Sequence, residues 1–258
     1  MSRLEFREVS KVYRIRGRGG RLTAVDKVSF TLEAGKTIAL VGQSGSGKST
    51  IAKLLLQLER PSSGSILLNG EPVRRRGLRA YRRTVQMVFQ DPFASLNPYH
   101  SIAHHLERPL KLHGKSATEA AVHELLERVQ LTPAAAIARR RPHELSGGQR
   151  QRVAIARALA PGPGILIADE PVSMLDVSIR LGVLNLLSDL QREENLGVLY
   201  ITHDLATARH FSDEIMVMRH GQIVERGPSD QVILDPQHDY TKLLLQASPN
   251  PEKHFSRS

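Results

Sequence analysis

An eight-residue segment at positions 42–49 limits what this chain can fold into more than any other feature. It reads Gly42-Gln43-Ser44-Gly45-Ser46-Gly47-Lys48-Ser49 and fits the pattern G-x-x-x-x-G-K-[ST]. A short apolar run, Ile38–Val41, precedes it, and residues 51–58 follow with apolar residues at helical spacing. A strand, a glycine-rich loop and a helix in this order are typical of a phosphate-binding loop. A chance glycine turn with this pattern would occur in about one chain in a hundred.

The residue types in this loop predict nucleotide binding. Glycines allow backbone N–H groups to curl around phosphate oxygens, and the N-terminus of the next helix adds positive potential. The Lys48 ammonium can reach the β- and γ-phosphates, and the Ser49 hydroxyl can bind Mg²⁺. We therefore expect the nucleotide to contact Gly42, Ser44, Gly45, Ser46, Gly47, Lys48, Ser49 and Thr50.

A second apolar run, Ile165–Ala168, ends in two acids, Asp169 and Glu170. On its own, such a pair could equally mark an ordinary strand end. In a chain that also carries a phosphate-binding loop, it matches the Walker B arrangement. We expect Asp169 to hold Mg²⁺ and Glu170 to act as the base that activates water.

Apolar patterning predicts an α/β fold with a mostly parallel central sheet. Alternating residues in the first thirty positions predict short antiparallel strands at its edge. Short apolar runs predict buried strands at Val85–Phe89, Ile165–Ala168 and Val198–Ile201. Between Asp91 and Ala160 helical spacing replaces strand patterns, as in Ala117–Val129 and Gln149–Leu159, which predicts an inserted helical subdomain.

The segment after His203 predicts a return to the sheet. A helix is expected first, followed by the strands Glu214–Met218 and Gln222–Glu225 around a His220-Gly221 turn. A short helix through Leu245 completes this part of the prediction.

Composition excludes several kinds of chemistry. The chain has no cysteine, which excludes disulfides, thiolate zinc sites and iron–sulfur clusters. No apolar run approaches about 18 residues, and the start is too polar for a signal peptide, so we expect the chain to remain in the cytoplasm.

The formal net charge of +10 is concentrated in three arginine-rich runs, Arg14–Arg21, Arg74–Arg83 and Arg139–Arg141. Nucleic acid, anionic lipid or an acidic partner could bind such runs. Because no aromatic nucleic-acid motif accompanies them, we favour a solvated surface and expect no nucleic-acid partner. His100, His104 and His105 include an i, i+4 pair that could bind a metal. No acid or cysteine lies nearby, so a polar surface patch is favoured there too.

The pentapeptide Leu145-Ser146-Gly147-Gly148-Gln149 precedes a predicted helix, so Ser146 can cap that helix while the two glycines expose backbone donors to an anion. It resembles in full the signature motif of ABC ATPases. The resemblance covers nearly the whole chain and implies the ABC ATPase fold: a RecA-like P-loop core, an N-terminal antiparallel β subdomain and an inserted helical subdomain. One domain spans residues 1–258, with its core at 1–90 and 161–227, the helical subdomain at 91–160 and a short extension at 228–258.

The resemblance also implies roles for residues outside these motifs. Tyr13 resembles the aromatic residue that stacks on adenine, and Gln90 resembles the Q-loop glutamine that links Mg²⁺ and the attacking water to a permease. Asp176 resembles the D-loop aspartate, and His203 resembles the switch histidine that holds the γ-phosphate. In such proteins the nucleotide of a second subunit meets the signature, here Ser146, Gly147, Gly148 and Gln149.

Three further segments resemble the peptide and nickel importer ATPases, and within that family the F-type subunit: Asp91–Pro98, Pro142–Leu145 and His238–Thr241. Arg141, Arg180 and Asp239 depart from the usual residues of that family, and many relatives extend beyond the Tyr240 element. The resemblance implies ATP and Mg²⁺ as cofactors and a peripheral location at the cytoplasmic face of the inner membrane. It implies two permease subunits and a second, nonidentical ATPase as partners, with an extracytoplasmic solute-binding protein acting indirectly.

The imported solute could be a peptide, a nickel chelate or a glycoside. A non-transport ABC ATPase, such as a subunit of a phosphonate-degradation complex, is the alternative. The Asp91–Pro98 segment argues against it, because that segment resembles the permease contact of transporters.

Overall fold

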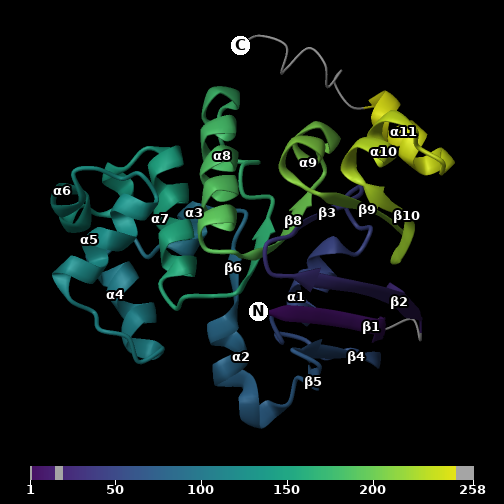
Figure 1. Cartoon of the computed structure of the whole chain (residues 1–258), viewed down its shortest axis with the longest axis horizontal. Coiled ribbons are helices and arrows are strands. Elements are labelled where there is room, and N and C mark those ends of the chain that lie inside the picture. The colour runs from purple at the N-terminus through teal and green to yellow at the C-terminus, as the bar shows by residue number, and fades with distance from the viewer. Residues whose placement is uncertain (1, 15–19, 248–258) are drawn as a thin grey trace.

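The computed structural model describes residues 2–14 and 20–247 and contains two β-sheets and a group of helices (Figure 1). Part of the basic run Arg14–Arg21 and the end of the expected C-terminal extension lie outside the described residues. In Figure 1 the helices α3 to α7 lie to the left, the sheets lie at the centre and right, and the helices α10 and α11 lie beside β9 and β10.

The first sheet is antiparallel and has the strand order β2-β1-β4-β5. Its strands are β1 (Arg3–Arg14), β2 (Arg21–Glu33), β4 (Ser63–Leu68) and β5 (Glu71–Pro72). Phe6 and Phe30 face each other across β1 and β2 with ring centroids 5.1 Å apart. The expected short strands are in fact 12 and 13 residues long, because β1 and β2 pair along most of their length. β4 and β5 were not predicted, since they lack clear alternation.

The second sheet has the order β10-β9-β3-β8-β7-β6 and is parallel except for β10. Its strands are β3 (Thr37–Val41), β6 (Val85–Val88), β7 (Ile165–Asp169), β8 (Gly197–Thr202), β9 (Glu214–Arg219) and β10 (Gln222–Pro228). All five residues of β3 are buried. Because parallel strands end at the same edge of a sheet, the loops after β3, β6, β7 and β8 meet there.

The two faces of the central strand β3 belong to two separate apolar cores. Ile38 and Leu40 join one core with the antiparallel sheet and helix α1 (Lys48–Leu55). Ala39 and Val41 join the other core, which contains α8 (Val177–Glu193), α9 (Leu205–Phe211) and the helices between β6 and β7. Side chains of a strand alternate between its faces, so one short apolar strand can anchor both layers.

Residues 91–164, all of which the structure describes, contain helices and no strand. The helices are α3 (Pro92–Ser95), α4 (Ile102–Leu112), α5 (Glu119–Arg128), α6 (Ala134–Arg139) and α7 (Gly147–Leu159), with a 3₁₀ turn at Pro142–Glu144. The predicted helices over Ala117–Val129 and Gln149–Leu159 correspond to α5 and α7. The exact limits of the three proposed subdomains stay a prediction.

The remaining helices are α2 (Leu78–Thr84), which follows a 3₁₀ turn at Arg75–Gly77, and the C-terminal pair α10 (Ser229–Leu234) and α11 (Asp239–Ala247). Two helices thus replace the single C-terminal helix expected from the sequence. Within residues 2–14 and 20–247, none of the helices has the length and apolar character needed to cross a membrane.

Candidate active site

The loop between β3 and α1 has the compact shape that phosphate binding requires. A Cβ on Gly42 would collide with the carbonyl oxygen of Met218, and one on Gly47 would collide with that of Ala24. Gly47 also has φ +117°, a conformation that favours glycine. The neighbouring β9–β10 turn supports the loop, because Gly221 N donates a 2.9 Å hydrogen bond to Ser46 O.

Lys48 and Ser46 point to an anionic ligand in this loop. Lys48 Nζ donates hydrogen bonds to Gly42 O at 2.5 Å and to Gln43 O at 2.9 Å, so its ammonium folds back over the loop. Burial lowers the pKa of Lys48, while the charges of Glu170 and Asp169 oppose this shift. The buried Ser46 Oγ has no hydrogen-bond partner among the described residues. Phosphate oxygens could accept from both groups, so these residues fit the expected ligand.

The ends of β6, β7 and β8 bring three predicted site residues into contact. Gln90 Nε2 donates to Glu170 Oε2 at 3.0 Å, and His203 Nδ1 lies 3.1 Å from Glu170 Oε1. Glu170 has φ +44°, which is uncommon for a residue other than glycine and recurs at functional sites. The sequence patterns therefore identified residues that meet in space although about 80 and 33 positions separate them.

Asp169 occupies the last position of β7, next to Glu170. Burial raises the pKa of Asp169 to about 6, the nearby Glu170 charge adds to the shift, and Lys48 opposes it. A buried carboxylate with one nearby cation still lacks full compensation of its charge. A divalent cation would supply it, and Ser49 at the start of α1 is exposed to solvent. The donor set Asp169, Ser49 and Gln90 thus fits Mg²⁺, which binds protein through few ligands and takes others from phosphates.

A polar cavity of about 60 Å³ lies behind Glu170 and His203 and is lined also by Ser173 and Arg180. Ser173 Oγ donates to Glu170 O at 3.0 Å, and Arg180 Nε donates to Leu175 O at 2.9 Å. The predicted D-loop residue Asp176 directly follows Leu175 and is exposed. It forms the N-cap of α8, but its side chain makes no cap hydrogen bond. Sequence reasoning assigned no role to Ser173.

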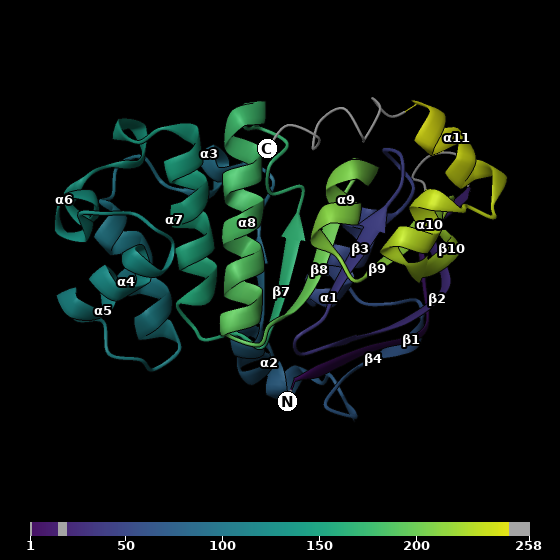
Figure 2. The same ribbon diagram turned by 45° about the horizontal axis from the view of Figure 1, so that its top comes forward.

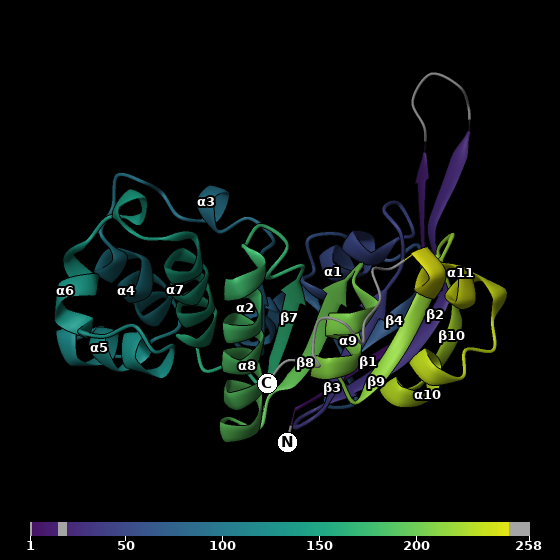
Figure 3. The same ribbon diagram turned by 90° about the horizontal axis from the view of Figure 1, so that it is seen from above.

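The signature segment begins helix α7 with a reciprocal cap. Ser146 Oγ accepts from Gln149 N at 3.3 Å, and Gln149 Oε1 accepts from Ser146 N at 3.0 Å. A Cβ on Gly148 would press against Ile179 of α8. α7 and α1 lie on opposite sides of α8 in all three ribbon views, so the structure does not bring the signature to the phosphate loop of the same chain (Figures 2 and 3).

Tyr13 lies near the end of β1, next to the first turn of α1. Its hydroxyl donates to Glu59 Oε2 at 2.5 Å and interacts with the Thr50 side chain. Lys11 Nζ lies 5.0 Å from the Tyr13 ring centroid. Burial and then the Glu59 bond raise the pKa of the Tyr13 hydroxyl. The structure thus places this aromatic ring close to the nucleotide loop.

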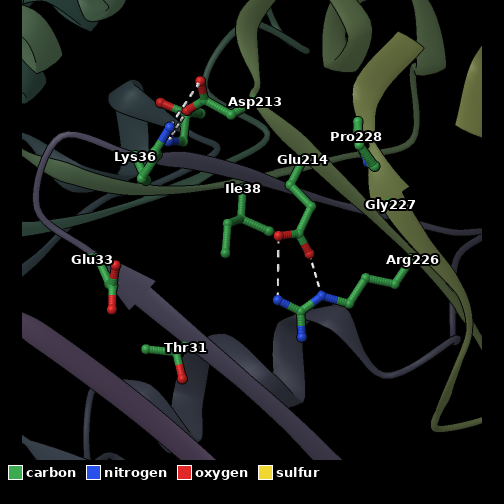
Figure 4. Close-up of a pocket in the computed structure, with 10 residues that line it drawn as sticks. Thr31, Glu33, Lys36, Ile38, Asp213, Glu214, Arg226, Gly227 and Pro228 are labelled. Carbon is green, nitrogen blue, oxygen red and sulfur yellow. Dashed lines mark hydrogen bonds and ion pairs between the residues drawn. The ribbon is translucent and has the colours of Figure 1, made fainter. Parts of the chain in front are cut away.

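A cavity of about 670 Å³ lies at the opposite end of β3 and includes none of the predicted site residues (Figure 4). Four of its charged side chains form two pairs. Arg226 Nη2 donates to Glu214 Oε2 at 3.2 Å, and Lys36 Nζ lies 3.9 Å from Asp213 Oδ1. Asp213 Oδ2 also accepts from Thr37 N at 2.8 Å, so these charges stabilise the junction of β3, β9 and β10.

His100 and His104 stack with ring centroids 4.0 Å apart, and His105 Nε2 lies 3.0 Å from Asn97 O. No group of three or more His, Cys, Asp or Glu residues within the described part of the chain could hold a metal ion. The expected polar surface patch is therefore only partly correct, because His100 is exposed but His105 is buried against the chain near Asn97.

Comparison with known proteins identifies the family. A model of the ABC transporter family matches residues 25–173, more than half of the chain. The oligopeptide transport ATP-binding protein OppF of Bacillus subtilis (strain 168) is 46% identical over 247 residues, 93% of this chain and 80% of that protein. The glutathione import ATP-binding protein GsiA of Escherichia coli (strain K12) is 50% identical over 241 residues, 91% of this chain but only 38% of its own length.

Solved structures share the fold. The dimeric structure of MJ0796, a bacterial ABC transporter cassette, matches with a TM-score of 0.76 and 29% identity, over 88% of this chain and 98% of that one. The same cassette has been solved in a post-hydrolysis state bound to ADP and Pi. CbiO1 from Clostridium perfringens, part of the transporter complex cbiONQ, has a TM-score of 0.78 and 27% identity, over 90% of both chains. The expected ABC ATPase fold is confirmed: this chain belongs to the ABC transporter family and is one of its ATP-hydrolysing subunits.

Proposed function

We propose that the chain energises the import of peptides or a related small solute by hydrolysing ATP beneath two membrane permeases. One observation carries the catalytic part of this proposal: Glu170 is held between Gln90 and His203 at the ends of three neighbouring strands. The pair of hydrogen bonds directs a carboxylate toward the edge of the sheet where the phosphate loop also lies. A base in this position can act on a water molecule next to a bound γ-phosphate.

Each residue has a distinct part in the reaction. Lys48 and the loop amides bind the β- and γ-phosphates, and His203, whose side chain is well exposed, can reach a γ-phosphate oxygen. Glu170 takes a proton from water as the water oxygen bonds to the γ-phosphorus. The bond from that phosphorus to the β–γ bridging oxygen breaks, and ADP leaves with the electron pair.

Asp169, Ser49 and Gln90 would hold Mg²⁺ in this site. When bound, this ion neutralises charge on the phosphates. The raised pKa of Asp169 supports the assignment, because a buried carboxylate of this kind needs a compensating cation. Tyr13 would stack on the adenine, with its ring oriented by the bond from its hydroxyl to Glu59.

A second subunit would complete the nucleotide site. The position of α8 between α7 and α1 supports this, because the signature segment begins α7 and the phosphate loop leads into α1 (Figure 3). The solved MJ0796 cassette is dimeric. We propose that the partner is a nonidentical ATPase, and that Asp176, exposed at the start of α8, lies at the contact between the subunits.

The relatives support the cargo class. OppF is an oligopeptide transport protein and GsiA a glutathione import protein, so peptides are the first substrate class to test. Permeases would bind near Gln90 and Asp91–Pro98 at the inner face of the membrane, and a solute-binding protein would deliver the cargo from outside. Nickel chelates and glycosides are further cargo classes, and the non-transport role remains the second candidate.

Reconstitution tests this proposal. The chain would be purified together with the ATPase and permeases encoded by neighbouring genes. ATP hydrolysis would then be measured in nanodiscs with and without peptide-loaded binding protein. We expect one copy of this chain per complex and hydrolysis stimulated by a peptide. A stable complex with two copies and no sister ATPase would exclude the nonidentical partner. Failure to bind any permease would favour the non-transport role.

A further inference from the structure

The C-terminal helix α11 contacts the phosphate loop directly through one side chain. Gln43 N, the first amide after Gly42, donates a 3.2 Å hydrogen bond to the hydroxyl oxygen of Tyr240. The two residues are 197 positions apart. Tyr240 belongs to the segment His238–Thr241, to which the reaction described above assigns no role.

Several contacts fix the position of the Tyr240 side chain. Tyr240 is 6% exposed, and the Arg219 guanidinium carbon lies 4.8 Å from its ring centroid. Its backbone N donates to His238 Nδ1 at 3.0 Å. The carboxylate of Glu225 on β10 accepts from His238 N at 3.1 Å and so ties the start of α11 to the sheet. The hydroxyl is therefore a preorganised acceptor.

Tyr240 completes a support on the outer side of the loop. Met218 on β9 packs against Gly42 and Gly47, and Gly221 N donates to Ser46 O at 2.9 Å. Tyr240 adds the only hydrogen bond that reaches the loop from α11 within the described residues. A loop that receives phosphates through backbone amides must hold those amides in a set orientation before binding.

We propose that Tyr240 is a positioning residue that holds the phosphate loop in its nucleotide-binding shape and thereby couples α11 to ATP affinity. This inference rests on the proposed role of the loop. Tyr240 itself touches no reacting atom. Its loss should weaken nucleotide binding and leave the chemical step intact, because Glu170, Gln90 and His203 are held by other contacts.

The test is the single-atom change Tyr240→Phe. We expect a roughly two- to tenfold rise in the ATP KM and in the Kd of ATP, the range for one neutral hydrogen bond, with kcat unchanged. Amide hydrogen exchange of the nucleotide-free protein should become faster at residues 42–47. Tyr240→Ala, which also removes the ring from beneath Arg219, should raise KM further.

Two matched variants separate the alternatives. Tyr81→Phe also deletes a buried tyrosine hydroxyl, which donates to Leu55 O at the far end of α1, and should lower the melting temperature with no change in KM. Lys48→Ala tests the loop itself. If Lys48→Ala loses ATP affinity while Tyr240→Phe keeps wild-type KM and loop exchange, this inference is wrong and the loop assignment stands. If Lys48→Ala retains full affinity, the proposed function of the loop fails. A drop in kcat alone for Tyr240→Phe would also overturn the inference.

Discussion

Glu170 Oε1 lies 3.1 Å from His203 Nδ1, and this contact joins the end of β7 to the end of β8. An ionised carboxylate only accepts hydrogen bonds, so the imidazole donates here through Nδ1. The same contact restrains a glutamate whose backbone has a positive φ, which keeps the carboxylate in one orientation.

The first prediction concerns this carboxylate. Glu170→Gln should lower kcat by about a hundredfold or more, since the amide cannot take a proton from water. ATP binding should persist, because Lys48 and the loop are untouched. Turnover and sedimentation with Mg-ATP would measure both effects, and an ATP-bound dimer should accumulate. Wild-type turnover in this variant would remove Glu170 from the role of base.

The second prediction concerns Lys48. Lys48→Ala should raise the Kd of ATP by about tenfold or more, because charge-assisted hydrogen bonds to phosphate are lost. Calorimetry would measure the affinity, and Lys53→Ala, on the same helix, serves as the control. Equal affinities for wild type and Lys48→Ala would contradict the assignment.

The third prediction separates the ring of Tyr13 from its hydroxyl. Tyr13→Leu should weaken ATP binding by about tenfold, as expected for the loss of base stacking. Tyr13→Phe should bind within about threefold of wild type, since only the hydroxyl contacts with Glu59 and Thr50 are lost and the ring is kept. Comparing ATP with inorganic triphosphate provides the check, because triphosphate binding should not respond to either change. Equal losses of ATP affinity in Tyr13→Leu and Tyr13→Phe would refute adenine stacking.

The fourth prediction concerns pH and stability. Asp169 has a pKa of about 6 in the fold against an ordinary value of 3.8, so the folded state binds its proton more tightly. The stability linked to this proton is fully present below about pH 4 and is lost as the pH rises through about 6, a loss on the order of 2–3 kcal/mol. Asp169→Asn should not show this loss of stability. The free energies of unfolding of wild type and Asp169→Asn, measured with urea in EDTA between pH 4 and 7.5, should therefore diverge as the pH rises. Parallel pH dependences of the two proteins would exclude the effect.

Much of the site was predictable because its parts are contiguous in sequence. The phosphate loop brings its amides, Lys48 and Ser49 together within eight positions, so a short pattern identifies it. The strand ending at Asp169 and Glu170 is equally local. The strands β4 and β5 escaped prediction because their residues, including Pro72 and the glycine Gly64, carry little periodic signal. They are specified by the pairing of β4 with β1 and of β5 with β4.

The sequence by itself determined the phosphate loop, the acids at the end of β7, the signature cap and the family to which they belong. Only the tertiary structure decided which distant groups meet these motifs: Gly221 on Ser46, and Tyr240 on the amide of Gln43. The physical reason is that local patterns reflect hydrogen bonds and burial within one element. Contacts between elements depend on how the elements pack, which brings Gln43, in the loop after β3, next to Tyr240 on α11 without leaving any periodic signal between them.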